Sequence, residues 1–421
     1  MDSNIIKISN KDKHILRDMA KQQLEIAHSP KMEKLRKDWI LHGNFDSSSR
    51  PMITMELWTF ADDIIPDRMR CEGDIARELE WSLHANVVNH LLFDDDTIVK
   101  DYIPVTYDSY FIPWGVDVKV EHTLDSSGGH SLGHNFVSVL SDLEEDFHKL
   151  GKSKFGIDKS SAQKRVHQLN GLFGDILPAK ITGSILYCCP MQNLVHIMSM
   201  EDMFMAMYDY PEIFKEVMAM QTRDYLELFD LMEKENYILP TIDECHLGQG
   251  SYCFNNKLPR EGDNLTTKDI WGYMDSQETS GVSAAMYGEF VAPYYKMISD
   301  RFGLFSYGCC EAIDPIWESS VSKWESLTKV SISPWCNERY MGDQLKNKEI
   351  VYLRKPTPNL IGVGSVLDED AVIAHFEETV SAATGTTLEI AQRDVYHINN
   401  TPDKVRRYVE LIRKCCDKHH K

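Results

Sequence analysis

The residues with the clearest chemical potential lie in the stretch LFSYGCCEAIDP, where an apolar run ends in a glycine. Two adjacent cysteines, Cys309 and Cys310, and the acid Glu311 follow that glycine. Thiolates combined with a histidine or a carboxylate suit zinc, and a catalytic zinc keeps three protein ligands and one open position. The remaining ligand would come from a neighbouring strand end: His246, Glu244 or Cys336. Alternatively, adjacent cysteines pack as small apolar side chains at the end of a buried strand.

Two further segments carry polar groups that could act on a substrate. The segment GYMDSQETSGVS (Gly272–Ser283) is expected to place Gln277 and Glu278 in a loop with serines and glycines, where a carboxylate can face a ligand. The alternative is a helix N-terminus, whose dipole a glutamate complements. In RKPTP, Arg354 and Lys355 offer two cations for a carboxylate or phosphate. The alternative for this second segment is a surface turn held by two prolines.

The charge and the cysteine usage restrict the class of protein. A formal net charge of −20 disfavours binding to nucleic acid or to an anionic membrane surface. Six of the ten cysteines form adjacent pairs, which indicates free thiols in a reducing compartment. The first residues, MDSNIIKISNKDKH, lack the apolar core of a signal peptide, and no run reaches the ~18 apolar residues of a membrane span. We therefore expect a soluble cytoplasmic protein.

Strand-like and helical segments alternate along most of the chain, after a helical extension over residues 1–45. This alternation predicts an α/β fold, and eight repeats over residues 46–421 favour a single (β/α)₈ TIM barrel. A dinucleotide-binding fold is disfavoured because no glycine-rich turn follows the first strand. The eight expected strands are Met52–Trp58, Tyr102–Tyr107, Lys180–Tyr187, Ile238–Glu244, Gly303–Cys309, Lys329–Ser333, Ile350–Arg354 and Thr387–Arg393.

The active site of such a barrel lies at the carboxyl ends of its strands. Those ends carry acids, thiols and cations, and also four aromatic residues: Trp58, Tyr107, Tyr307 and Trp335. An aromatic wall of this kind would favour a methoxy-aromatic or a quaternary ammonium substrate. We expect Glu56, at the end of the first strand, to contact the substrate as well.

Several strand-end segments resemble the uroporphyrinogen decarboxylase superfamily, in the branch related to corrinoid (cobalamin)-dependent methyltransferases. The segments are YGCCE, VSISPWC, VYLRKPTP and TTLEIAQRDVYHI, and the likeness extends over nearly the whole chain. The resemblance implies a single barrel, a zinc ion, and a corrinoid carried on a partner protein. The chain departs from the family in two places. Tyr307 stands where the thiol-methylating members have a zinc-binding histidine, and MELWTFADD lacks the arginines that grip porphyrinogen carboxylates.

The favoured hypothesis is a methyltransferase that moves a methyl group between a small methylated substrate and the corrinoid. Glu278 or Glu311, assisted by Gln277 and Tyr307, or a zinc ion at Cys309 and Cys310 would polarise the substrate. Two alternatives stay open. One is a lyase or decarboxylase that anchors a small carboxylic acid on Arg354 and Lys355, and the other is a non-catalytic module that binds the corrinoid protein. The methyl donor, the direction of transfer and the oligomeric state, a homodimer included, stay undetermined.

Overall fold

The computed structural model describes residues 8–124, 131–241 and 243–419. Two helices begin the described chain, α1 (Asn10–Ala27) and α2 (Pro30–Gly43). Each starts at a serine, Ser9 or Ser29, whose hydroxyl accepts a hydrogen bond from a backbone N–H of the first turn. The helical segment expected at the N-terminus is thus present from residue 10 to residue 43; residues 1–7 lie outside the described ranges.

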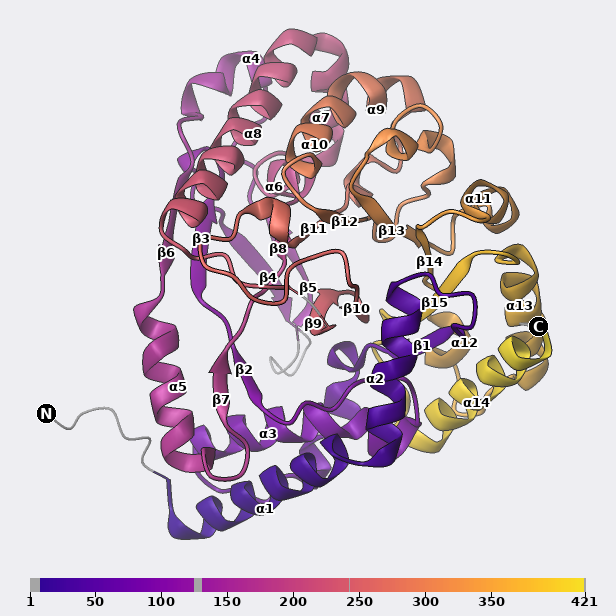
Figure 1. Ribbon diagram of the computed structural model, residues 1–421. Coiled ribbons are helices and arrows are strands. Elements are labelled where there is room, and N and C mark those ends of the chain that lie inside the picture. The colour runs from indigo at the N-terminus through magenta and orange to yellow at the C-terminus, as the bar shows by residue number, and fades with distance from the viewer. Residues whose placement is uncertain (1–7, 125–130, 242, 420–421) are drawn as a thin grey trace, which may run out of the picture.

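A seven-stranded parallel sheet forms the centre of the molecule, and helices cover its outer face (Figure 1). Neighbouring strands follow the order β1-β15-β14-β13-β12-β11-β8. Their bounds are Met52–Met55 (β1), Thr387–Gln392 (β15), Val351–Arg354 (β14), Leu327–Ile332 (β13), Leu304–Tyr307 (β12), Trp271–Met274 (β11) and Leu186–Tyr187 (β8). Because all pairs are parallel, the carboxyl ends of the strands meet at one edge. The expected parallel α/β architecture is confirmed to this extent.

Smaller sheets and the helices complete the architecture. β2 (Ile103–Val105) pairs in parallel with β7 (Ala179–Ile181), while β3 (Asp108–Ile112) pairs with β6 (Lys154–Asp158) and β4 (Val120–Leu124) with β5 (Ser131–Phe136). The other helices are α3 (Asp74–Val88), α4 (Leu143–Asp146), α5 (Ser160–Phe173), α6 (Pro190–Val195), α7 (Met200–Asp209), α8 (Pro211–Lys234), α9 (Ala284–Phe290), α10 (Ala292–Ser299), α11 (Glu338–Leu345), α12 (Asn359–Gly362), α13 (Glu369–Ala382) and α14 (Pro402–His419). None of the helices in the described ranges combines the length and the apolar character that a membrane crossing requires.

One expected strand is in a different place. The fourth expected strand, Ile238–Glu244, is extended chain that leads into a hairpin of β9 (Asp243–Gly248) and β10 (Ser251–Cys253); Ile242 lies outside the described residues. In the sheet, the position expected for this fourth strand is occupied by β11, which comes from a segment that the sequence predicts to be a loop. Pro240 explains part of the error, because proline cannot donate to a central ladder. The hairpin lies inside the ring of strands (Figure 1).

A buried ion pair fixes the hairpin inside the ring. The Lys329 ammonium on β13 donates hydrogen bonds to Ser251 Oγ (2.8 Å), to the Tyr252 carbonyl (2.9 Å) and to Glu389 Oε2 on β15 (2.8 Å). Both charged side chains are almost fully buried. A buried charge requires a partner, so this pair ties the hairpin to two strands of the sheet.

The described strands do not form a closed ring of hydrogen bonds, because β1 pairs with β15 alone. Two carboxylates satisfy the free edge of β1 in place of a strand. Asp96 Oδ2 accepts from the Ile53 N–H and Asp95 Oδ2 from the Met55 N–H, each at 2.8 Å. The Asp96 N–H returns a bond to the Ile53 carbonyl at 2.8 Å. Side chains thus meet the hydrogen-bonding need of a buried strand edge.

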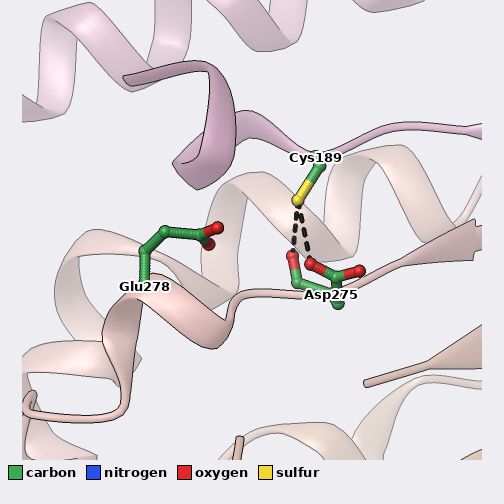
Figure 2. A group of neighbouring side chains, drawn as sticks. All are labelled: Cys189, Asp275 and Glu278. Carbon is green, nitrogen blue, oxygen red and sulfur yellow. Dashed lines mark hydrogen bonds between the residues drawn. The ribbon is translucent and has the colours of Figure 1, made fainter. Parts of the chain in front are cut away.

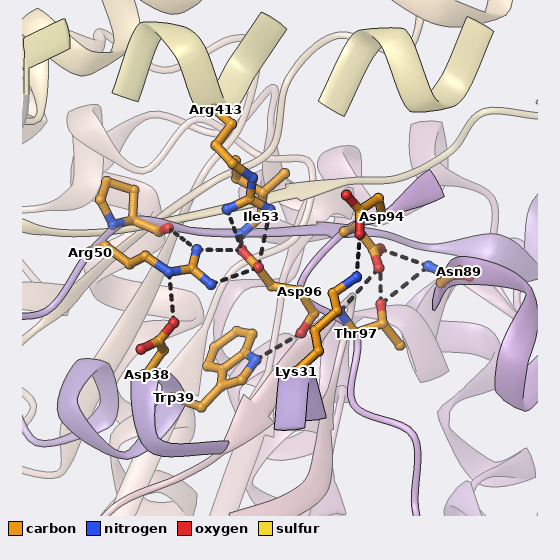
Figure 3. A network of polar contacts seen from close by, with 12 residues as sticks. Lys31, Asp38, Trp39, Arg50, Ile53, Asn89, Asp94, Asp96, Thr97 and Arg413 are labelled. Atoms are coloured by element: carbon orange, nitrogen blue, oxygen red, sulfur yellow. Dashed lines mark hydrogen bonds and ion pairs between the residues drawn. The ribbon is translucent and has the colours of Figure 1, made fainter. Parts of the chain in front are cut away.

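Asp96 is the centre of a larger polar network (Figure 3). Arg50 reaches both carboxylate oxygens, at 2.9 and 2.8 Å, and Arg413 of α14 approaches them from the other side at 3.4 and 3.1 Å. Trp39 of α2 donates to the Asp96 carbonyl at 2.8 Å. Although burial opposes ionisation, the two guanidinium groups lower the pKa of Asp96 below its ordinary value. The network therefore joins α2, β1 and α14 through one carboxylate.

We expect Asp96→Asn to lower the free energy of unfolding by about 3 kcal/mol or more, because two arginines would lose their buried counter-ion. Urea unfolding followed by circular dichroism measures this loss. Asp94→Asn is the matched control, because the Asp94–Lys31 pair is half exposed and should contribute less than about 1 kcal/mol. Equal effects of the two substitutions would contradict the role given to Asp96.

Candidate active site

Acids, thiols and cations gather at the carboxyl edge of the parallel sheet. They lie at the ends of five strands of that sheet: Tyr187 as the last residue of β8 and Cys189 after it, Asp275 and Glu278 after β11, Cys309, Cys310 and Glu311 after β12, Lys355 after β14, and Arg393 and Asp394 after β15. The carboxyl edge is where open and closed parallel α/β folds bind ligands. We therefore treat this edge as the candidate active site.

Gly308 brings the two adjacent cysteines to the same side. β12 ends at Tyr307, and Gly308 has a φ of 97°, a left-handed conformation that glycine adopts without strain. Beyond this turn the strand alternation no longer applies, and the sulfur atoms of Cys309 and Cys310 lie 3.3 Å apart. The two thiols can thus act on the same ligand.

Cations surround the Cys309 sulfur. Arg393 Nη1 donates to it at 2.9 Å, and the buried Lys355 ammonium lies nearby, 3.2 Å from the Gly308 carbonyl. The hydrogen bond from Cys310, followed by the charges of Lys355 and Arg393, lowers the pKa of Cys309 to about 6. The hydrogen bond to the Cys309 sulfur, followed by burial, raises the pKa of Cys310. At neutral pH the pair therefore consists of one thiolate and one thiol.

Glu311 joins two of the strand-end loops. Its Oε1 accepts from the Ser276 N–H at 2.9 Å and its Oε2 from the Cys309 N–H at 2.8 Å. Burial, with the neighbouring charge of Asp275, raises its pKa to about 7. Both oxygens are engaged with backbone, so Glu311 positions the loops after β11 and β12. Its expected role as the acid that contacts the substrate finds no support in these contacts.

Cys189, Asp275 and Glu278 form a second cluster (Figure 2). Within the described ranges, these three residues offer ligand atoms that all lie within 4.8 Å of one another. The Cys189 thiol donates to Asp275 Oδ1 and to the Asp275 carbonyl, both at 3.1 Å. All three side chains are buried, and Glu278 Oε2 has no hydrogen-bond partner. Burial, with the charge of Asp275, raises the pKa of Glu278 to about 7.

Tyrosines hold Asp275 in place. Its Oδ2 accepts hydrogen bonds from the hydroxyls of Tyr187 (3.1 Å) and Tyr273 (2.9 Å), and its carbonyl accepts from Tyr295 (2.9 Å). The Tyr187 and Tyr273 rings stack at 5.0 Å. These contacts leave Oδ1 directed at Cys189, so the orientation of the carboxylate is determined before any ligand binds.

Tyr307 lies away from the open edge. Its hydroxyl lies 2.6 Å from both Ser276 Oγ and the Tyr287 hydroxyl, and its ring packs edge-on against Trp324 at 4.7 Å. The side chain is fully buried under the helices that cover the sheet. Its contacts are those of a core residue with a satisfied hydroxyl, so they do not support the expected catalytic role.

The residues that are expected to bind the substrate differ from one another in their neighbours and in their exposure. Glu56 pairs with Arg393 at 2.9 Å and, together with the largely exposed Trp58, lines a cavity of about 440 Å³. Trp335 is exposed at the end of β13. Tyr107 lies against Tyr237 instead, in a separate cavity of about 370 Å³.

Arg354 is buried, and both terminal nitrogens of its guanidinium are already paired, while its Nε has no partner. It contacts Glu338 at 2.5 Å and donates to the carbonyls of Ile332 and Ser333 at 3.0 and 2.7 Å. An arginine held in this way is not free to anchor a substrate carboxylate. Gln277, by contrast, is half buried beside Glu278, in a short 3-10 turn over Gln277–Thr279 that follows β11.

His246 does not share a metal-ligand cluster with Cys309 and Cys310 among the described residues. It lies on β9, is exposed, and lines two open cavities, of about 690 and 440 Å³, together with Lys100 and Tyr102. The protein atoms around the ring, followed by the charge of Lys100, lower its pKa below the ordinary value. The guanidinium at 2.9 Å from the Cys309 sulfur also disfavours a cation there. Zinc at Cys309, Cys310 and His246 stays a prediction.

The sequence pattern did not single out Cys189, Asp275 or Arg393. Cys189 belongs to one of the adjacent cysteine pairs, with nothing else in the sequence to distinguish it, and Asp275 follows none of the eight expected strands. A strand placed at Trp271–Met274 would have put Asp275 at a strand end. Arg393 ends the last expected strand, but the sequence does not indicate its partner.

A thiolate at Cys309 has a measurable consequence. We expect the ultraviolet thiolate absorbance that is lost in Cys309→Ser to titrate with a midpoint near pH 6, below the ordinary cysteine pKa of about 8.5. Arg393→Met should raise this midpoint, because it removes a cation that stabilises the thiolate. A midpoint at or above the ordinary value would contradict the geometry described for this thiol.

Comparisons with known proteins do not identify a function for this chain. No family model matches the chain, and no curated protein matches it in sequence. A solved methyltransferase from Methanosarcina mazei is similar in structure, with 10% sequence identity and a TM-score of 0.47 over 92% of this chain and 99% of that one. A likeness this low says nothing about the reaction, which must be inferred from the side chains themselves.

Proposed function

We propose that the chain is a methyltransferase that moves a methyl group between a small methylated substrate and a corrinoid bound to a separate protein. The observation that carries the proposal is the layout of the carboxyl edge: a floor of buried thiols, acids and cations, next to loops with exposed aromatic side chains. The corrinoid itself enters through the resemblance of the strand-end segments to methyltransferases of that type.

The floor suits the loss of a methyl group. When the methyl carbon leaves a donor oxygen, nitrogen or sulfur, that atom keeps the electron pair of the broken bond and becomes more negative. Fixed cations in a water-poor site stabilise such charge. Lys355 is 2% exposed, and Arg393 lies beside it, paired with Glu56 and the Cys309 sulfur, so two fixed cations lie on one side of the floor. The reduced metal of the corrinoid would supply the electron pair for the new bond.

Apolar side chains stand out from the loops that surround this floor. Trp58 is 61% exposed after β1, Trp335 76% after β13 and Tyr396 62% after β15. Val363 and Val366, in the loop between β14 and α13, are also exposed. Four adjacent strands therefore end in exposed apolar groups, a composition typical of a protein-binding surface. A cofactor carried on a partner protein would reach the floor from this side.

The fold proposal that accompanies this function is a (β/α)₈ barrel left open between β1 and β2. Counting β7 and β8 as one bent strand, the chain offers eight strands in ring order: β1, β2, β7/β8, β11, β12, β13, β14 and β15. The helices α1 and α2 would precede the barrel as an extension. The lyase alternative loses one of its two expected carboxylate anchors, because Arg354 is paired with Glu338, and keeps Lys355.

The test is a spectroscopic assay of methyl transfer. The chain, reduced free cobalamin and a panel of methoxy-aromatic, methylamine and methylthiol donors should yield methylcobalamin with at least one donor, in a chain-dependent reaction. A complex with a corrinoid protein but no turnover with any donor would instead support the non-catalytic binding module.

Lys355→Met should lower kcat by about 10²-fold, because one fixed charge opposite the leaving group is lost. The matched control is Lys268→Met, which removes an exposed lysine just before β11, at the opposite edge of the sheet. Equal rates for wild type and Lys355→Met would remove Lys355 from the proposed site.

A further inference from the structure

We propose that Cys189, Asp275 and Glu278 bind one divalent, zinc-type metal ion. The inference concerns binding alone and does not depend on the methyl-transfer reaction. It differs from the site expected from the sequence, because the ligands come from the ends of β8 and β11, and Cys309, Cys310 and His246 take no part.

The donor set suits zinc. One thiolate and two carboxylates provide three protein ligands from two neighbouring strand ends, all within 4.8 Å of one another. Zinc accepts sulfur and oxygen ligands, and three protein ligands leave the fourth tetrahedral position for water or another molecule. In Figure 2 the Glu278 carboxyl group points toward Cys189 and Asp275 from the opposite side of the cluster.

The unpaired oxygen of Glu278 points to a missing ligand. Glu278 is 7% exposed, and its Oε2 is buried without a hydrogen-bond partner. Buried polar atoms are nearly always paired, so an orphaned carboxylate oxygen aimed at a thiol and a second carboxylate requires an explanation. A metal ion would occupy the space that this oxygen faces.

The charges of the cluster also favour a cation. Cys189, Asp275 and Glu278 are all acidic groups buried at one place, whereas the cation Arg393 donates to the Cys309 sulfur and Lys355 to the Gly308 carbonyl. Burial, with the charges of Asp275 and Glu278, raises the pKa of the Cys189 thiol well above its ordinary value. Binding of a metal ion would replace the Cys189 proton, which passes to solvent as the sulfur–metal bond forms.

The surroundings of the cluster are arranged as they are around known metal ligands. Tyr187 and Tyr273 donate to Asp275 Oδ2, the oxygen that faces away from Cys189, and Tyr295 fixes the Asp275 carbonyl. Hydrogen bonds of this kind orient a ligating carboxylate and leave its other oxygen for the metal. Asp275 is thereby preorganised whether or not an ion is present.

Metal binding by the full-length, reduced protein tests the proposal. After treatment with a chelator, the chain is titrated with Zn²⁺ against a chromophoric competitor, and separately with Co²⁺. We expect about one ion per chain, with a thiolate-to-cobalt charge-transfer band in the near ultraviolet. Cys189→Ser should abolish that band, and Glu278→Gln should weaken affinity at least about tenfold.

Two matched variants locate the site. Cys309→Ser removes a thiol from the cluster expected from the sequence, and Cys188→Ser removes the buried neighbour of Cys189; both should keep the ion and the band. No stoichiometric binding by wild type would overturn the proposal, as would loss of the band in Cys309→Ser together with its retention in Cys189→Ser. Circular dichroism establishes that each variant is folded, so a loss of binding is not a loss of structure.

Discussion

Two aspartates occupy the edge of β1 that a neighbouring strand would otherwise cover, and the architecture depends on them. Asp95 and Asp96 accept the backbone N–H groups of β1, while Arg50 and Arg413 hold Asp96 ionised between α2 and α14. A buried strand edge must be satisfied by some partner. Because side chains satisfy it, the ring of strands stays open at this point, and the cavity lined by Glu56 and Trp58 lies beside the opening.

At the carboxyl edge of the sheet, the charged side chains form two separate regions. After β12, β14 and β15, two cations hold one thiol ionised; after β8 and β11, a thiol and two acids lie together with an unpaired carboxylate oxygen. Glu311 connects the regions through the backbone of Ser276 and Cys309. A displacement of either loop would therefore shift the side chains of both regions.

Polar residues at strand ends are not equally available for chemistry. Tyr307 and Arg354 are residue types that are common in catalytic sites, yet both form their hydrogen bonds inside the protein. Tyr307 bonds to Ser276 and Tyr287. Arg354 bonds to Glu338 and to backbone carbonyls. Lys355, one residue further along than Arg354, is the cation beside the thiolate. Successive side chains of a strand point to opposite faces, so a shift of one residue decides whether a side chain faces the core or the candidate site.

The sequence by itself determined the parallel α/β class, the N-terminal helices, and the concentration of thiols, acids and cations at strand ends. It could do so because periodicity and strand order are local properties. It misplaced one strand, since short apolar runs such as Ile238–Thr241 and Trp271–Met274 look alike until their pairing partners are known. Only the tertiary structure decided which side chains meet: Arg393 with Cys309, and Cys189 with Asp275 and Glu278. These contacts join segments about 85 residues apart, and their distances follow from packing, which no spacing along the chain encodes.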